Sequence, residues 1–295
     1  MPVIDERVSV SVRKILFATD FSVAAEKAAS YARSVARRYG STVELAHVLD
    51  PATIETYEEA VVGVLLSDRR EAAKEILKNL THEFQAAGVD SEAKPLEGHF
   101  PAKLLLKLAA DDGVDLIVAG TEAKSGLERL VLGSTAEQLL RAAECPVLTV
   151  GPKVPTAAEA PFHPQRILYA TDLSPDSAKS AVFALSFAED HGAHLYLCHV
   201  VDDPLASPEQ RRQKFHAFQA KLKHLVPDST YDWCSPQCVV TEGEATEEIL
   251  KLAEGLNPDL IVVGAHRRSG WRSHLERGVV PSLLAEATCP VLSVC

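Results

Sequence analysis

The sequence predicts an α/β protein made of two tandem domains, each with a parallel sheet covered by helices on both sides. Three observations predict this fold class. Short apolar runs such as KILFAT and VELAHV lack polar alternation, which is typical of parallel strands buried on both faces. These runs alternate with helical patterns, which favours right-handed crossovers in a parallel sheet. The chain has 295 residues, which fits two domains of about 150 residues each.

Four motifs occur twice and in the same order, which indicates duplication of a whole domain. They are ILFATDFS (15–22) and ILYATDLS (167–174), LAHVLD (45–50) and LCHVVD (197–202), DLIVAG (115–120) and DLIVVG (259–264), and CPVLTV (145–150) and CPVLSV (289–294). The copies are 152 residues apart at the early motifs and 144 residues apart at the late ones. The second copy is therefore eight residues shorter in its middle.

A proline-rich stretch separates the two copies. Four prolines within GPKVPTAAEAPFHPQ (151–165) favour an extended, semi-stiff connection over a helix or a central strand. We therefore place domain 1 at residues 1–152, the linker at 153–164 and domain 2 at 165–295.

Helix signals follow the first strand and recur in the middle of each copy. Ser22 predicts the start of a helix that runs through Tyr39 and ends at Gly40. Two further helices carry apolar residues spaced three or four apart, which places them on one helix face. These stripes are Ala73, Ile76, Leu77, Leu80 and Phe84 in domain 1, and Phe215, Phe218, Leu222 and Leu225 in domain 2. We interpret both stripes as core rather than as cofactor contacts.

Composition narrows the class of partner. A formal net charge of −11 argues against nucleic acid as a binding partner, because clustered Lys and Arg are needed to neutralise its phosphates. No run approaches the roughly 18 apolar residues of a membrane span, and MPVIDERVSV lacks signal-peptide features, so we expect a cytoplasmic protein with no membrane partner. Six cysteines are too few for a disulfide framework. Cys234 and Cys238 lack a second pair at zinc spacing, so we expect reduced thiols and no metal site.

Ligands of parallel α/β sheets bind outside the carboxyl ends of the strands. Ala18, Thr19 and Asp20 stand at the end of the first strand in this chain, and Val48 stands at the end of the second. A carboxylate such as Asp20, or Asp172 in the second copy, can accept hydrogen bonds from a ribose hydroxyl. It can equally cap the helix that follows. The residues alone leave both interpretations open.

The stretch GTEAKSGLERLVLGST (120–135) predicts a second part of the site. Gly120 predicts a sharp turn that brings backbone N–H groups near a ligand. Gly133 and Ser134 stand where a helix begins, and the first turn of a helix offers unpaired N–H donors and a partial positive charge. Together these residues predict a site for a phosphate or another anion, with the Ser134 hydroxyl as a further donor. The alternative is that Gly120 only ends a strand and Ser134 only caps a helix.

With these four motifs in duplicate, nearly the whole chain resembles the universal stress protein family as two tandem domains. The resemblance implies a doubly wound, five-stranded parallel sheet in each domain, of the Rossmann-like, adenine nucleotide alpha hydrolase-like type. It also implies that the domains pair through their last strands, Val147 to Val150 against Val291 to Val294, and a homodimer is a further option.

The resemblance extends to a nucleotide pattern in domain 1. Nucleotide-binding members carry glycine, two residues, glycine, nine residues, and then glycine followed by Ser or Thr. Gly120 matches the first glycine, Ala123 stands in place of the second, and Gly133 with Ser134 matches the end. Alanine adds one methyl group, which the loop tolerates if that position does not need a positive φ.

The same carry-over assigns the remaining contacts in domain 1. It implies that Asp20 meets the ribose or the phosphates, that the backbone of Val48 meets the adenine ring, and that Thr135 adds a donor to the phosphates. The implied ligand is ATP or AMP, with or without magnesium.

Domain 2 departs further from the pattern. Asp172, Val200 and Gly264 are retained, but Arg267 replaces the second glycine and Arg277 stands in place of the last one. Bulky side chains there favour a lost or changed site, although Arg can itself bind phosphate. The basic loop 266–277 is interpreted as a solvated loop, or alternatively as an anion site or a docking patch for an acidic partner.

We rank three functions from the sequence. The first is a nucleotide-responsive stress protein that acts through domain 1, and the second is a stress scaffold that binds no nucleotide and acts through protein partners. An adenylating or ATP-hydrolysing enzyme ranks last, because no GxxxxGK[ST], HxGH or SGGxDS motif is present. Lys124 is interpreted as solvated, and His47 and His199 as structural, so we expect no catalytic residue.

Overall fold

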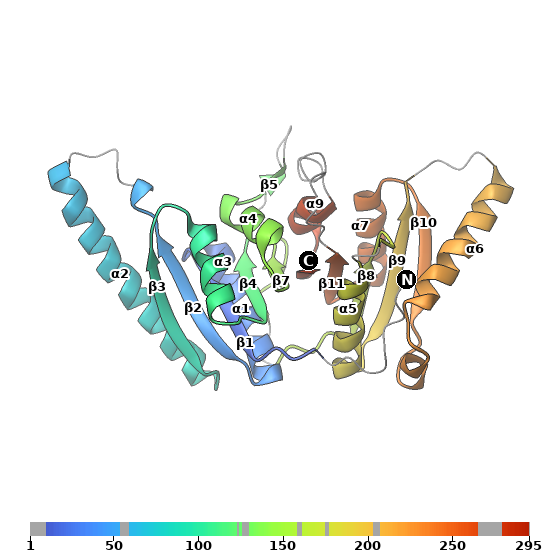
Figure 1. The fold of residues 1–295 in the computed structure, drawn as a ribbon, viewed down its shortest axis with the longest axis horizontal. Helices are drawn as coiled ribbons and strands as arrows, with labels where there is room; N and C mark the ends of the chain where they lie inside the picture. The colour runs from blue at the N-terminus through green and yellow to red at the C-terminus, as the bar shows by residue number, and fades with distance from the viewer. Residues whose placement is uncertain are drawn as a thin grey trace.

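The computed structural model describes residues 10–53, 59–122, 124–125, 130–157, 161–174, 177–202, 207–264 and 279–294. Its centre is a ten-stranded sheet in the order β10-β9-β8-β11-β12-β7-β4-β1-β2-β3. Helices cover both faces of this sheet (Figure 1). The α/β class predicted from the sequence is confirmed.

The first half of the chain supplies one end of the sheet. Its elements are β1 (Lys14–Ala18), α1 (Val23–Tyr39), β2 (Thr42–Leu49), the 3-10 turn η1 (Pro51–Thr53), α2 (Glu59–Ala86), β3 (Ser91–Glu97), α3 (Pro101–Asp111), β4 (Leu116–Gly120), β5 (Lys124–Ser125), β6 (Leu130–Val131), α4 (Ser134–Ala142) and β7 (Val147–Val150). Its strands in the large sheet, β7-β4-β1-β2-β3, are all parallel.

The second half repeats the alternation of large-sheet strands and helices. Its elements are β8 (Arg166–Ala170), α5 (Ser177–His191), β9 (His194–Val201), α6 (Pro208–His224), the 3-10 turn η2 (Asp228–Asp232), β10 (Gln237–Glu242), α7 (Ala245–Leu256), β11 (Leu260–Gly264), α9 (Val279–Glu286) and β12 (Val291–Val294). The strand order β12-β11-β8-β9-β10 matches that of the first half, as expected for a duplicated domain.

The core lies in two layers, one on each face of the sheet. In β1, Ile15 and Phe17 pack into one layer while Leu16 packs into the other, because successive side chains of a strand point to opposite faces. The predicted stripe on α2 is wrong at Ile76, which is 44% exposed, whereas its neighbour Leu77 is fully buried. Adjacent helical residues are about 100° apart, so only one of the two can face the sheet.

Local sequence fixes the ends of α1. The Ser22 hydroxyl accepts a hydrogen bond from the backbone N–H of Ala25 at 3.2 Å. Gly40 closes the helix with φ +64, a left-handed conformation that glycine adopts without strain. The predicted helix from Ser22 through Tyr39 to Gly40 is confirmed.

The two halves meet through β7 and β12, the one antiparallel pair of the large sheet among the strands described. Leu148 lies opposite Leu292 in this pair. Directly after β7, Gly151 lies against α9, and a Cβ there would overlap the carbonyl oxygen of Leu284. The junction therefore combines strand pairing with close backbone packing.

The described part of the linker contacts α1. The backbone N–H of Phe162 donates to the carbonyl of Ser34 at 3.0 Å, and that of Ala157 donates to the Ser30 hydroxyl at 2.9 Å. Val154 and Phe162 are buried. The described part of the linker contains no helix or strand, in keeping with its prolines.

A polar cluster joins the C-terminal ends of α1 and α5. The buried His191 lies 3.1 Å from the Tyr39 hydroxyl, and its Nδ1 accepts from Arg38 Nε at 3.3 Å. His163 of the linker approaches the same Nδ1 to 3.3 Å, and the Tyr39 hydroxyl donates to Asp190 at 3.4 Å. Burial, the charge of Arg38 and the neighbouring His163 lower the pKa of His191 to about 4.

None of the helices described combines the length and the apolar character that crossing a membrane would require.

Candidate functional site

Several predicted site residues of the first half lie at the carboxyl ends of three neighbouring strands. The sheet order places β1 between β4 and β2. Ala18 and Ala119 form the last register pair between β1 and β4, and Thr19 and Gly120 directly follow this pair. In β2, Ala46 pairs with Ala18, and Val48 lies two residues further along the same strand. Strand order reverses direction between β4 and β1, which is where open α/β sheets bind ligands.

A tight turn after β1 holds Asp20. The Thr19 hydroxyl accepts from the N–H of Phe21, and Asp20 Oδ1 accepts from the N–H of Ser22, both at 3.0 Å. Between them Phe21 takes φ +64, a conformation unusual for a bulky residue. Asp20 is exposed and stabilises this turn, while Ser22 caps α1. A carboxylate accepts at both oxygens, so the turn contact at Oδ1 is compatible with a ligand contact at Oδ2.

The second half repeats this turn after β8. Leu173 has φ +59, and its N–H donates to the Thr171 hydroxyl at 3.0 Å. The N–H of Ser174 donates to Asp172 Oδ1 at 2.9 Å. Turn formation thus accounts for the aspartate in both copies.

His47 ties the end of β2 to this turn. Its Nδ1–H donates to the Thr19 carbonyl at 2.9 Å, and its ring stacks on Phe21 with 4.1 Å between ring centres. Burial lowers the pKa of His47, so the ring is neutral near pH 7. In the second half, His199 makes the same 2.9 Å contact to Thr171.

Sequence reasoning missed this histidine contact. The available signal was the spacing, because 28 residues separate the threonine from the histidine in both copies. A constant spacing between two short motifs at neighbouring strand ends indicates a direct contact between them.

The prediction of a sharp turn at Gly120 is wrong. Gly120 pairs with Val150 of β7, and the N–H of Thr121 continues this pairing at 3.0 Å from the Val150 carbonyl. A Cβ at Gly120 would overlap the carbonyl of Ala24 and lie 2.8 Å from the backbone nitrogen of Ala25. The missing side chain therefore lets α1 approach β4 closely, which explains this glycine without a ligand.

The loop after β4 contains a hairpin that sequence reasoning did not predict. Lys124 pairs with Val131 and Ser125 with Leu130, in antiparallel register. The hairpin lies beyond the carboxyl end of β4, next to α4 (Figure 1). Ala123 lies outside the described residues, as does 126–129.

Gly133 and Ser134 begin α4, as predicted. Gly133 is exposed, has φ −57, and would meet no atom within 4 Å if it carried a Cβ. Ser134 is exposed and Thr135 is half-buried in the first turn. The N–H groups of that turn have no partner inside the helix, so they can bind an anion. Glu137 in the same turn is paired with Arg141 at 2.7 Å, which offsets its negative charge.

The predicted second site is described only in part. Asp172 forms the turn after β8, Val200 is half-buried in β9, and Gly264 ends β11 opposite Val294. Arg267, Arg277 and the basic loop 266–277 lie outside the described residues.

Two further features of the described chain bear on its chemistry, the metal-ligating side chains and the buried thiols. Within these residues no group of three or more His, Cys, Asp or Glu side chains is arranged to hold a metal ion. Burial raises the pKa of the Cys198 and Cys289 thiols to about 12, so both are protonated and unreactive.

Both halves of the chain are similar to known proteins. The model of the Universal stress protein family matches residues 11–151 and 164–294. Universal stress protein MJ0531 of Methanocaldococcus jannaschii is 34% identical over 139 residues, which cover 47% of this chain and 81% of that protein. Universal stress protein MJ0577 of the same organism is 30% identical over 157 residues, which cover 48% of this chain and 96% of that protein. The crystal structure of a universal stress protein from Archaeoglobus fulgidus has a TM-score of 0.71 at 17% identity and covers 96% of this chain and 98% of its own; it supports the fold.

Proposed function

Because this chain belongs to the universal stress protein family, we propose that its first half binds an adenine nucleotide, ATP or AMP, and that the protein acts as a nucleotide-responsive regulator of a stress response. One observation carries the proposal. The exposed Asp20 directly follows β1, the half-buried Val48 lies near the end of β2, and the Gly133–Ser134 start of α4 comes after β4 and its hairpin. In the sheet, β1 lies between β4 and β2, at the switch point of the strand order.

The two ends of the proposed site suit different parts of a nucleotide. Around β1 and β2, the Asp20 carboxylate can accept from a ribose hydroxyl, and half-buried Val48 offers backbone and apolar contact to a base. At α4, the first-turn N–H groups and the Ser134 and Thr135 hydroxyls can donate to phosphate oxygens. The pairing of Glu137 with Arg141 reduces repulsion between that turn and a phosphate.

A nucleotide bound at this edge would contact a turn that is connected to both β1 and β2. His47 connects the Thr19 carbonyl to the end of β2, so a ligand that contacts Asp20 acts on a turn already fixed to two strands. The protein's part in this mechanism is to bind and orient the nucleotide, and we propose no catalytic step. Magnesium would enter with the nucleotide phosphates rather than through a dedicated cluster of protein ligands.

We propose that the second half has lost or changed this site. It keeps the Asp172 turn and Gly264, but its sequence has Arg267 and Arg277 where the pattern has glycine. The two halves then differ in ligand although they share a fold.

A scaffold that binds no nucleotide is the second candidate, and the geometry of the glycines favours it. Gly120 is explained by packing against α1, and Gly133 has an ordinary backbone conformation with open space around it. Neither glycine therefore needs a ligand to account for it. On this alternative the protein acts through partners on its surface.

Calorimetric titration with ATP and with AMP, each with and without magnesium, distinguishes the two candidates. We expect one site per chain, and we expect Gly133→Arg to abolish it by copying the second-half residue into the exposed N-cap of α4. Gly63→Arg is the matched control, because Gly63 is exposed on α2 with no atom within 4 Å of its Cβ position. Absence of binding, or binding that survives Gly133→Arg, would favour the scaffold.

A further inference from the structure

A cavity of about 490 Å³ opens at the carboxyl ends of β9 and β10, at the far end of the second half. Its lining residues are Asp202, Arg211, Phe215, Glu242 and Gly243. Asp202 follows β9, Arg211 and Phe215 lie on α6, and Glu242 ends β10. None of the described residues predicted for a nucleotide lines this cavity, and the cavity lies in the other half of the chain from the proposed nucleotide site.

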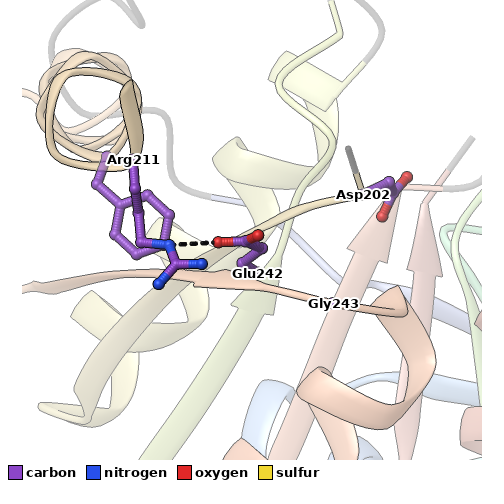
Figure 2. A pocket seen from close by; sticks show the side chains of 5 residues that line it. Asp202, Arg211, Glu242 and Gly243 are labelled. Carbon is purple, nitrogen blue, oxygen red and sulfur yellow. Dashed lines mark hydrogen bonds and ion pairs between the residues drawn. The ribbon is translucent and has the colours of Figure 1, made fainter. Parts of the chain in front are cut away.

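The wall formed by β10 and α6 is held in place by specific contacts. Arg211 Nε donates to Glu242 Oε2 at 2.7 Å, and Figure 2 shows these two side chains pointing toward each other across the opening. The N–H of Gly243 donates to the Val201 carbonyl at 3.2 Å. Gly243 has φ +149, and a Cβ there would lie 3.0 Å from Glu248 Cγ, so glycine leaves a bare backbone wall.

The charges of the lining select the ligand. Arg211 is compensated by Glu242, and Asp202 adds a second carboxylate, which in Figure 2 lies apart from that ion pair. The described lining residues together carry one net negative charge, so they would repel an anion and attract a cation. Phe215 supplies an apolar surface. The volume falls in the range of roughly 300–1,000 Å³ typical of small-molecule sites.

We propose that this cavity binds small organic ammonium ions. The ammonium group contacts the Asp202 carboxylate, and the hydrocarbon body packs on Phe215 beside the Arg211–Glu242 pair. The proposal does not depend on nucleotide binding, since the two sites lie in different halves of the chain.

The first half contains a related arrangement of side chains. Arg70 on α2 holds Glu97 at the end of β3 with Nε and Nη2, at 3.0 and 3.1 Å from Oε2 and Oε1. Asp50, which corresponds to Asp202, accepts from the N–H of Ala52 at 3.0 Å and lies 3.6 Å from His99 Nδ1. Asp50 is therefore engaged locally, which makes it the natural control position.

The probes are 2-phenylethylammonium and its neutral analogue 2-phenylethanol. Each is titrated into the full-length protein, and binding is monitored by NMR through the amide resonance of Gly243. We expect a saturable shift with the ammonium ion and none with the alcohol. Asp202→Asn should weaken ammonium binding about tenfold, the loss expected for one charge-assisted contact at an exposed site. Asp50→Asn should leave it unchanged.

Arg211 provides a test of opposite sign. Arg211→Gln removes one positive charge from beside the Glu242 carboxylate, so ammonium binding should tighten severalfold, whereas Arg211→Lys should stay near the wild-type affinity. An anion site would behave in reverse, with Asp202→Asn strengthening binding and Arg211→Gln weakening it. That reversal, the lack of a saturable shift at Gly243, or equal binding of the alcohol would each overturn the proposal.

Discussion

Replacing Gly120 with alanine separates a packing role of this glycine from a ligand role. The added Cβ would overlap the carbonyl of Ala24 and lie 2.8 Å from the nitrogen of Ala25. These are main-chain atoms of the first turn of α1, so they cannot rotate away as a side chain could. Relief of the overlap requires α1 to move off β4, and α1 contributes buried residues such as Ala28 and Val35 to the core.

The expected loss of stability follows from this geometry. Overpacking of a core typically costs about 1–3 kcal/mol, and a clash with backbone belongs at the upper end, so we expect the free energy of unfolding to fall by about 3 kcal/mol. For a protein of this size class each kcal/mol lowers Tm by roughly 2–4 °C, which gives a fall of about 6–12 °C. The loss should be present without any nucleotide.

Urea unfolding followed by circular dichroism, with calorimetry for Tm, measures this effect. Gly133→Ala is the matched control, because Gly133 has φ −57 and open space at its Cβ position, so its stability should stay within about 0.5 kcal/mol of wild type. A Gly120→Ala protein as stable as the Gly133→Ala protein would refute the packing explanation.

Two further predictions concern the junction of the halves and the first helix. The pKa of His191 is about 4 in the folded protein, against an ordinary value of 6.5. Between these two pH values the unfolded chain binds a proton that the folded chain does not. The free energy of unfolding therefore falls as the pH falls. Between pH 7.5 and pH 5 this loss should be about 2 kcal/mol and should be missing from His191→Gln; equal pH slopes in the two proteins would contradict it. Ser22→Ala removes the cap of α1 and should cost about 1 kcal/mol in urea unfolding. Ser134→Ala should cost much less, since Gly133 occupies the N-cap of α4; a similar loss in both variants would contradict the assignment of Ser22 as the cap.

Much of the fold could be predicted because the responsible signals are local or repeated. Apolar runs without alternation indicate strands buried on both faces, and β1 and β4 are such strands. Ser22 and Gly40 mark the ends of α1 because capping depends on a few adjacent residues. Duplicate motifs then extend each assignment to the second half.

Features that depend on contacts distant in sequence could not be predicted. The reason for Gly120 is a backbone approach from Ala24, nearly a hundred residues earlier, which no local pattern encodes. The left-handed Phe21 has no glycine or asparagine to indicate it, and its conformation depends on the Thr19 and Asp20 turn contacts. The β5–β6 hairpin has two-residue strands, too short to show a periodicity.

The location of the candidate site can be predicted from topology, whereas its details cannot. Ligand binding at strand ends is a rule of topology, so Asp20, Val48 and Gly133 could be named from the order of the strands. The Arg211–Glu242 cavity could not, because it arises from a helix and two strands whose lining residues share no motif.

The pairing of β7 with β12 has a consequence for assembly. Each of these strands has the other on one side and a parallel partner, β4 or β11, on the other side, so both of its hydrogen-bonding edges are occupied within a single chain. A second molecule cannot join through these strands unless the existing pair opens. The open borders of the large sheet are instead β3 and β10, and Pro95 in β3 lacks the N–H that a neighbouring strand would need. Because the two halves are covalently tethered, the junction forms at any protein concentration, and either half can change the loops at its strand ends without losing its partner.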